Sequence, residues 1–183
     1  LTDEGLPVHY EDTPGFIPEQ FRSVENTWVV FTPAVPADNA ELNYLMNRGY
    51  TLFKRSEILG QITRGHKTVA VAGTHGKTTV STMISYILSQ SKAGCNAFLG
   101  GISKNFNSNL VLHEQSDWMV TEADEFDRSF LRLYPYAAVV TAMDPDHLDI
   151  YGTEKSMQDA FQSFIDQVNP EGVLLVKSEL PLI

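Results

Sequence analysis

The sequence predicts an α/β fold with a doubly wound, mostly parallel sheet. Segments rich in β-branched and aromatic residues alternate along the chain with segments whose apolar residues recur at helical spacing. Several strand-like segments are almost wholly apolar, as expected for parallel strands that are covered on both faces. Such sheets bind ligands at the carboxyl ends of their strands, so the residues that follow each strand are the first candidates for function.

The N-terminal part predicts a strand followed by a helix. Residues 27–32 form a β-branched and aromatic run that ends before Pro33, which is typical of a buried strand leading into a loop. A helix is expected next, because Asp38 followed by Glu41 makes a capping box. Gly49 lies where a left-handed C-cap ends such a helix.

The strand and helix pattern then restarts, which predicts two domains. Residues 51–54 predict a second strand, and residues 63–66 predict a linker. The predicted boundary divides the chain into residues 1–64 and residues 65–183.

The second part begins with a strand, a glycine-containing loop and a helix, in that order. The strand is predicted at residues 68–72. The apolar residues of the helix follow the positions i, i+3, i+4, i+7 and i+8, as Val80, Met83, Ile84, Ile87 and Leu88. Further strands are predicted at residues 96–100, 118–121, 137–141 and 172–177, and a further helix at residues 157–168.

The composition excludes several classes of function. Thirteen basic and 23 acidic residues give a formal net charge of -10, which argues against a non-specific grip on nucleic acid or on an anionic membrane. Cys95 is the single cysteine, so no intrachain disulfide can form, and its mostly apolar surroundings indicate a structural role. No apolar run approaches the roughly 20 residues that a spanning helix needs. A cytoplasmic protein without a nucleic-acid or membrane partner is therefore expected.

The loop Gly73-Thr74-His75-Gly76-Lys77-Thr78-Thr79 contains the parts of a phosphate-binding site. Glycines let backbone N–H groups converge on an anion, a helix N-terminus adds partial positive charge, and a lysine adds a full one. We expect Lys77, on a loop open to solvent, to reach the β- and γ-phosphates of ATP, and Thr78 to ligate Mg²⁺. The loop is a shortened variant of the Walker pattern, whose first glycine would fall at Val71. The alternative is a polar turn with no bound ligand.

Acidic residues follow the strand predicted at residues 118–121. They are Glu122, Asp124, Glu125 and Asp127. Carboxylates this close repel one another unless a cation or hydrogen-bond donors compensate them. The sequence leaves open a solvated acidic loop and a magnesium-holding carboxylate, for which Glu122 is the best candidate because it is nearest to the strand.

A third polar cluster follows the strand predicted at residues 137–141. It consists of Asp144, Asp146, His147 and Asp149. A histidine can ligate a metal or transfer a proton, although a lone histidine is more often structural. Its place at a third strand end of the same sheet favours a functional role for His147.

These three segments, in this order and spacing, resemble the Mur ligase family of peptidoglycan synthesis. They are the loop from Gly73, the run Glu-Ala-Asp-Glu-Phe-Asp-Arg-Ser-Phe-Leu from Glu122, and Asp-His-Leu-Asp-Ile-Tyr-Gly from Asp146. The resemblance implies a partial Rossmann-like UDP-sugar domain over residues 1–64 and a partial P-loop-type ATPase domain over residues 65–183. It also implies that the chain is a fragment.

The resemblance further implies an ATP-dependent carboxylate–amine ligase that joins L-alanine to UDP-N-acetylmuramate in cell-wall synthesis, with ATP and Mg²⁺ as cofactors. It implies that Lys77 contacts the ATP phosphates, that Thr78 and Glu122 hold one magnesium, and that His147 helps to hold a second. Lys77 and His147 are the catalytic candidates. Ala142 departs from the family, whose members often carry Asn there. The alternatives are a muramoyl-tripeptide ligase of the same family and a non-catalytic nucleotide-binding module.

Overall fold

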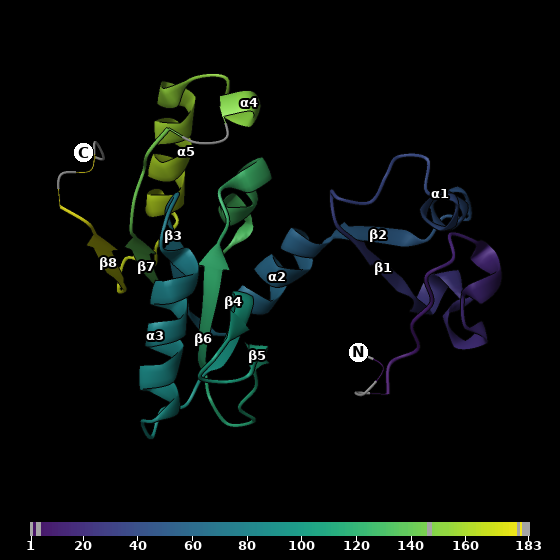
Figure 1. The fold of residues 1–183 in the computed structure, drawn as a ribbon, viewed down its shortest axis with the longest axis horizontal. Helices are drawn as coiled ribbons and strands as arrows, with labels where there is room; N and C mark the ends of the chain where they lie inside the picture. The colour runs from purple at the N-terminus through teal and green to yellow at the C-terminus, as the bar shows by residue number, and fades with distance from the viewer. Residues whose placement is uncertain (1, 3–4, 146–147, 179, 181–183) are drawn as a thin grey trace. The chain divides into compact units, whose positions relative to one another are not determined.

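The chain forms two compact units, Leu1–Ile58 and Leu59–Ile183. The structure is a computed structural model, drawn in Figure 1, and it describes residues 2, 5–145, 148–178 and 180. Each unit contains one sheet, and the candidate phosphate loop belongs to the second unit. The predicted α/β class with a mostly parallel sheet is confirmed.

The division between the units comes after Ile58, within helix α2 (Arg55–Arg64), and not after Arg64 as the sequence indicated. The second half of α2 packs on the second unit. Gly60 lies so close to the carbonyl group of Arg132 that a Cβ atom would collide with it. The Thr63 hydroxyl oxygen accepts a hydrogen bond from the backbone N–H of Tyr134 (3.2 Å). Sequence reasoning missed this helix, whose ten residues include three charged ones and a glycine.

The first unit is built around two parallel strands, β1 (Trp28–Phe31) and β2 (Thr51–Lys54), joined through helix α1 (Ala40–Asn47). Both strands and the helix lie where they were predicted, but β1 is not the buried strand that was expected, since Trp28 is 70% and Val30 50% exposed. The predicted cap is wrong by one residue, because Asn39, not Asp38, caps α1 and accepts a hydrogen bond from the N–H of Leu42 (2.7 Å). Between residue 5 and β1 lie three short 3-10 helices: η2 (Pro14–Phe16), η3 (Glu19–Phe21) and η4 (Val24–Asn26).

The second unit contains a six-stranded sheet in the order β5-β4-β6-β3-β7-β8. All neighbours are parallel except β5 and β4. The strands are β3 (Lys67–Ala72), β4 (Asn96–Ser103), β5 (Ser108–Val111), β6 (Trp118–Ala123), β7 (Ala137–Val140) and β8 (Val173–Val176). Five of these strands were predicted. The polar strand β5 was not, because its four residues carry no continuous apolar run.

Helices cover both faces of this sheet. Alternate residues of a strand point to opposite faces. Val69 and Val120 therefore share a core with Ile84 and Leu88 of α3 (Lys77–Ser89). On the other face, the buried alanines of β3 and β7 pack with Phe161 of α5 (Glu154–Asp166) and with the 3-10 helix η5 (Phe126–Arg132). A short helix α4 (Leu148–Tyr151) precedes α5.

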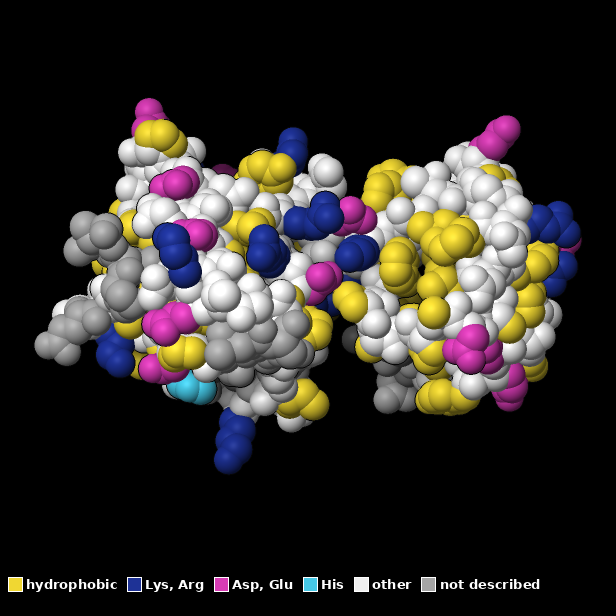
Figure 2. Space-filling view, turned by 90° about the horizontal axis from the view of Figure 1, so that it is seen from above, with side chains coloured by type: hydrophobic (Ala, Val, Ile, Leu, Met, Phe, Trp, Pro, Cys, Tyr) yellow, Lys and Arg dark blue, Asp and Glu magenta, His cyan; other side chains and the backbone are white. Residues whose placement is uncertain are grey.

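The described surface carries charges of both signs. On the face drawn in Figure 2, acidic and basic side chains are interspersed, and no broad basic field is visible. No helix in the described part of the chain is long and apolar enough to cross a membrane. Cys95 is buried, and burial raises the pKa of its thiol, which fits the predicted structural role.

Candidate functional site

The loop between β3 and α3 has the backbone that its glycines make possible. Gly73 has φ 132° and Gly76 has φ 83°, which are left-handed conformations that other residues rarely adopt. A Cβ atom on Gly73 would also lie 2.8 Å from the backbone nitrogen of Ala142 and would collide with the Thr141 hydroxyl. The chain therefore needs glycine at this position to bring the loop against the end of β7.

The segment after β7 holds this loop through hydrogen bonds. The Thr141 hydroxyl has a single proton, which faces the carbonyl oxygens of His75 (2.5 Å) and of Ala72 at the end of β3 (3.1 Å). The N–H of Thr74 donates to the carbonyl of Ala142 (3.2 Å), and the N–H of Asp144 donates to the Thr74 hydroxyl (3.1 Å). Ala142 thus serves the site through its backbone. Two strand ends meet here, as expected for a doubly wound sheet.

Lys77 is the first residue of α3, and its ammonium group is held from two directions. Nζ lies 2.9 Å from the carbonyl oxygen of Gly73 and 2.8 Å from each carboxylate oxygen of Glu125. The Lys77 side chain is only 17% exposed and that of Glu125 only 2%. The prediction of a solvent-open lysine is therefore wrong, because a buried carboxylate draws its ammonium group toward the core.

Two of the predicted metal ligands lie on the same side of the loop. Glu122 is in β6, and its Oε1 accepts a hydrogen bond from the N–H of Gly100 (2.5 Å). The Ser81 hydroxyl has a single proton, whose two nearby acceptors are the carbonyl oxygen of Thr78 (3.1 Å), one turn earlier in α3, and Glu122 Oε1 (3.5 Å). Thr78 and Thr79 are exposed on the first turn of the helix. A hydroxyl and a carboxylate are oxygen ligands of the kind that Mg²⁺ prefers.

The third predicted cluster is described only in part. Asp144 lies near His75, with 3.7 Å between a carboxylate oxygen and Nε2, and both side chains are about 70% exposed. Asp146 and His147 lie outside the described residues, so the roles expected of His147 stay predictions. Among the residues that the structure does describe, no group of three or more His, Cys, Asp or Glu side chains is arranged to hold a metal.

Glu125 is a candidate site residue that sequence reasoning did not single out from the acidic run. It is 1% exposed, and its backbone carbonyl accepts hydrogen bonds from the Tyr151 hydroxyl (2.6 Å) and the N–H of Arg128 (3.0 Å). Burial, and next the nearby Glu125 charge, raise the pKa of Tyr151 to about 12. The acidic run after β6 signalled a site, but four neighbouring carboxylates gave no sign of which one is buried.

The arrangement supplies what phosphate binding requires. The end of β3 combines the left-handed glycines, the N-terminus of a 13-residue helix and Lys77. Glu122 lies in the neighbouring strand, β6. The left-handed backbone of Gly73 and Gly76 is of the kind that lets the N–H groups of a loop converge on an anion. The residues present therefore fit a nucleotide phosphate with a bound Mg²⁺.

Comparisons with known proteins agree with this site. A family model described as the Mur ligase middle domain matches residues 71–182. The UDP-N-acetylmuramate–L-alanine ligase of Parabacteroides distasonis is 52% identical over 177 residues, which cover 97% of this chain and 38% of that protein. The enzyme of the same name from Porphyromonas gingivalis is 50% identical over 182 residues, or 100% of this chain and 40% of that protein. The chain therefore spans about two fifths of the length of these relatives.

Solved structures give the same picture of the fold. The UDP-N-acetylmuramate–alanine ligase of Thermotoga maritima superposes with a TM-score of 0.74 at 27% identity, over 87% of this chain and 38% of that chain. A UDP-N-acetylmuramate:L-alanyl-γ-D-glutamyl-meso-diaminopimelate ligase from Neisseria meningitides gives a TM-score of 0.76 at 24% identity, over 85% of this chain and 53% of that chain. The second likeness concerns the fold alone.

Proposed function

The chain belongs to the Mur ligase family, and we propose that the full-length protein joins L-alanine to the carboxylate of UDP-N-acetylmuramate in peptidoglycan synthesis, driven by ATP. The observation that carries this proposal is the phosphate loop, in which Lys77 and the left-handed glycines lie beside the Glu122 carboxylate. Relatives named UDP-N-acetylmuramate–L-alanine ligase are about 50% identical over the whole chain, which supports the choice of substrates.

The loop would bind the ATP phosphates through backbone N–H groups between Gly73 and Lys77 and through the ammonium group of Lys77. The N-terminus of α3 adds a partial positive charge at the same point. These groups are fixed before the reaction, because Thr141 and Ala142 hold the loop from the neighbouring strand end. Preorganised donors of this kind stabilise the charge that develops on a transferred phosphoryl group.

Thr78 and Glu122 are the residues that would hold a magnesium ion, and His147 is proposed to help hold a second. Magnesium supplies positive charge that neutralises the phosphate oxygens during transfer. The hydrogen bond from the Gly100 N–H orients the Glu122 carboxylate at the end of β6, so that it need not reorganise to reach a ligand.

The proposed reaction has two balanced steps. A carboxylate oxygen of the muramoyl group attacks the γ-phosphorus of ATP, which gives an acyl phosphate and ADP. The amine of L-alanine then attacks the acyl carbon, forms the amide bond, and releases inorganic phosphate and a proton. In both steps the chain contributes positioning and charge, because the loop and Lys77 would hold the phosphates, and Thr78 and Glu122 would hold the magnesium ion.

The test is phosphate release by the purified full-length protein with ATP, Mg²⁺ and UDP-N-acetylmuramate. We expect release to depend on L-alanine, and mass spectrometry to detect UDP-N-acetylmuramoyl-L-alanine. Phosphate release with the L-alanyl-γ-D-glutamyl-meso-diaminopimelate tripeptide but not with L-alanine would favour the tripeptide ligase instead. Magnesium-dependent ATP binding without ligation of either acceptor would favour a nucleotide-binding module. We place the reaction in the cytoplasm, where ATP and UDP-linked sugars are present.

A further inference from the structure

The Lys77–Glu125 ion pair is an unusual feature of the candidate site. Glu125 is the only charged residue among the buried residues of the described chain. Removing a carboxylate from water is costly unless a cation and hydrogen bonds compensate it. Here both carboxylate oxygens contact the same ammonium group at 2.8 Å. The burial of Glu125 therefore depends on Lys77.

The contacts of Lys77 use the full donor capacity of its ammonium group. An ammonium has three N–H donors. The three acceptors in the structure are the Gly73 carbonyl and the two oxygens of Glu125. A lysine otherwise has a flexible four-carbon stem, so its charge is poorly localised. The carboxylate restrains this charge next to the Gly73–Gly76 loop.

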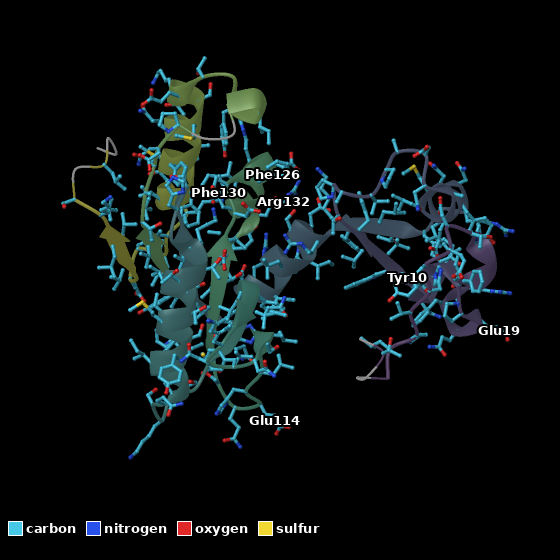
Figure 3. All side chains as sticks on the ribbon, in the orientation of Figure 1. Tyr10, Glu19, Glu114, Phe126, Phe130 and Arg132 are labelled. Atoms are coloured by element: carbon cyan, nitrogen blue, oxygen red, sulfur yellow. The ribbon has the colours of Figure 1, made fainter. Side chains whose placement is uncertain are left out.

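Glu125 is itself fixed to the core of the second unit. Tyr151 and Arg128 donate hydrogen bonds to its backbone carbonyl, and the N–H of Phe130 donates to the carbonyl of Asp124 (2.9 Å). Phe130, labelled on η5 in Figure 3, is fully buried and packs on two phenylalanine rings of α5 at centroid distances of 5.1 and 5.2 Å. The carboxylate is therefore held by a packed core.

We propose that Glu125 is a positioning residue for the phosphate-binding lysine. When a nucleotide binds, its phosphate replaces the Gly73 carbonyl as the acceptor of one Lys77 N–H. Glu125 keeps the other two N–H groups and so holds the ammonium in place. Complete exchange of Lys77 from Glu125 to a phosphate is disfavoured, because it would leave a buried carboxylate unpaired. The pair has no net charge, so Glu125 lowers the attraction of the loop for phosphate. In return, it holds the Lys77 ammonium in position for phosphoryl transfer. This inference rests on the proposed function of the loop.

The test is the Glu125→Gln variant of the full-length protein. Glutamine has nearly the same size and retains a carbonyl oxygen that can accept one hydrogen bond from Lys77. The negative charge is lost, so we expect Mg²⁺-free ATP, titrated in EDTA, to bind about tenfold more tightly. The lysine is less restrained, so we expect kcat to fall by on the order of 10- to 100-fold. A residue with a merely structural role would not produce tighter binding together with slower turnover.

The matched control is Glu114→Gln, which makes the same chemical change at an exposed residue. Glu114 lies in the second unit at the end opposite η5, as Figure 3 shows. We expect this variant to keep the wild-type affinity and kcat. Wild-type values for Glu125→Gln, or a loss of both affinity and turnover, would overturn the positioning role.

A stability measurement tests the same pair without nucleotide. It remains informative even where Glu125→Gln folds poorly. Lys77→Met leaves the buried carboxylate unpaired, so we expect a lower thermal midpoint than that of the wild type. Adding Glu125→Gln should raise the midpoint of the Lys77→Met variant, and additive losses would overturn the pairing. The two proposals fail separately. Wild-type protein that binds ATP but ligates no amine would overturn the function, whereas Glu125→Gln with wild-type ATP affinity would overturn the positioning role.

Discussion

Lys77 shows how one residue can serve both the chemistry and the stability of a site. The sequence predicts its contact with phosphate from the glycine loop and the helix that follows. Its partner Glu125 lies 48 residues further along the chain, and the contact between them depends on how η5 packs. Breaking a buried pair by removing one partner costs roughly 3–5 kcal/mol of stability. A variant at Lys77 therefore tests function only when its fold is checked.

The glycines of the loop could be predicted, whereas the choice among the carboxylates could not. The backbone has a positive φ angle at Gly73 and Gly76, which favours glycine there, and a local sequence pattern is enough to indicate such a turn. Glu122 and Glu125 belong to one acidic run but have different surroundings. Glu122 is partly exposed beside Gly100, whereas Glu125 is buried and its backbone contacts Tyr151 of α4. Burial of this kind is decided by tertiary packing, which one sequence does not show.

We expect Glu122→Ala to remove a ligand of the magnesium site. In the full-length protein, kcat should fall by on the order of a hundredfold, because the charge that stabilises the phosphoryl group is less well held. The Mg²⁺ concentration that gives half-maximal activity should rise. The measurement is ligase activity as a function of Mg²⁺ concentration, with Asp127→Asn as the control, for which we expect a much smaller effect. Equal effects of the two variants would mean that the acidic run acts as a general field without a discrete ligand.

At the scale of elements, segments with an apolar run or a clear helical period were predictable, and more polar segments such as α2 and β5 were not. The apolar runs gave five strands of the larger sheet, and helical spacing gave α3 and α5. The capping prediction for α1 was off by one residue, because Asp38 and Asn39 are both good cap residues and the sequence cannot rank two neighbours. The 3-10 helices and β5 are too short and too polar to produce a period.

The N-terminus of α1 has a second acceptor that sequence reasoning could not find. The Asp12 carboxylate accepts hydrogen bonds from the N–H groups of Ala40 (2.8 Å) and Glu41 (3.0 Å), 28 and 29 residues away. These bonds favour the charged form and lower the pKa of Asp12. A carboxylate whose folded pKa is depressed stabilises the fold above its unfolded pKa, and this contribution is lost as the pH falls through the folded value.

We therefore expect Asp12→Ala to destabilise the first unit at neutral pH. The stability difference from the wild type should shrink as the pH falls below about 4, the ordinary range of an aspartate. Urea unfolding at several pH values measures this difference. Asp38→Ala is the matched control, because Asp38 is exposed and is not the cap of α1. A stability difference for Asp12→Ala that does not depend on pH would contradict the carboxylate as its origin.

At the scale of the molecule, the order of two α/β units could be predicted from the sequence, but the point where they divide could not. The division within α2 is set by tertiary contacts of Gly60 and Thr63, which no local pattern reveals. The phosphate loop, Glu122 and Glu125 all belong to the second unit. This unit therefore contains the described part of the candidate site within one sheet.

The outer strand of that sheet makes a final prediction about the 183-residue chain by itself. Val173, Leu174, Leu175 and Val176 of β8 are 38–59% exposed, although apolar strands of parallel sheets are usually covered on both faces. An exposed apolar edge strand can pair with another chain. We expect the isolated chain to associate as its concentration rises, as measured by size-exclusion chromatography with light scattering. Leu175→Lys should weaken this association, because a charge on an edge strand opposes pairing. The control is Ile87→Lys, at an exposed apolar residue of α3, which should leave the association unchanged. Equal effects of the two variants would show that general surface hydrophobicity, not the strand edge, drives association.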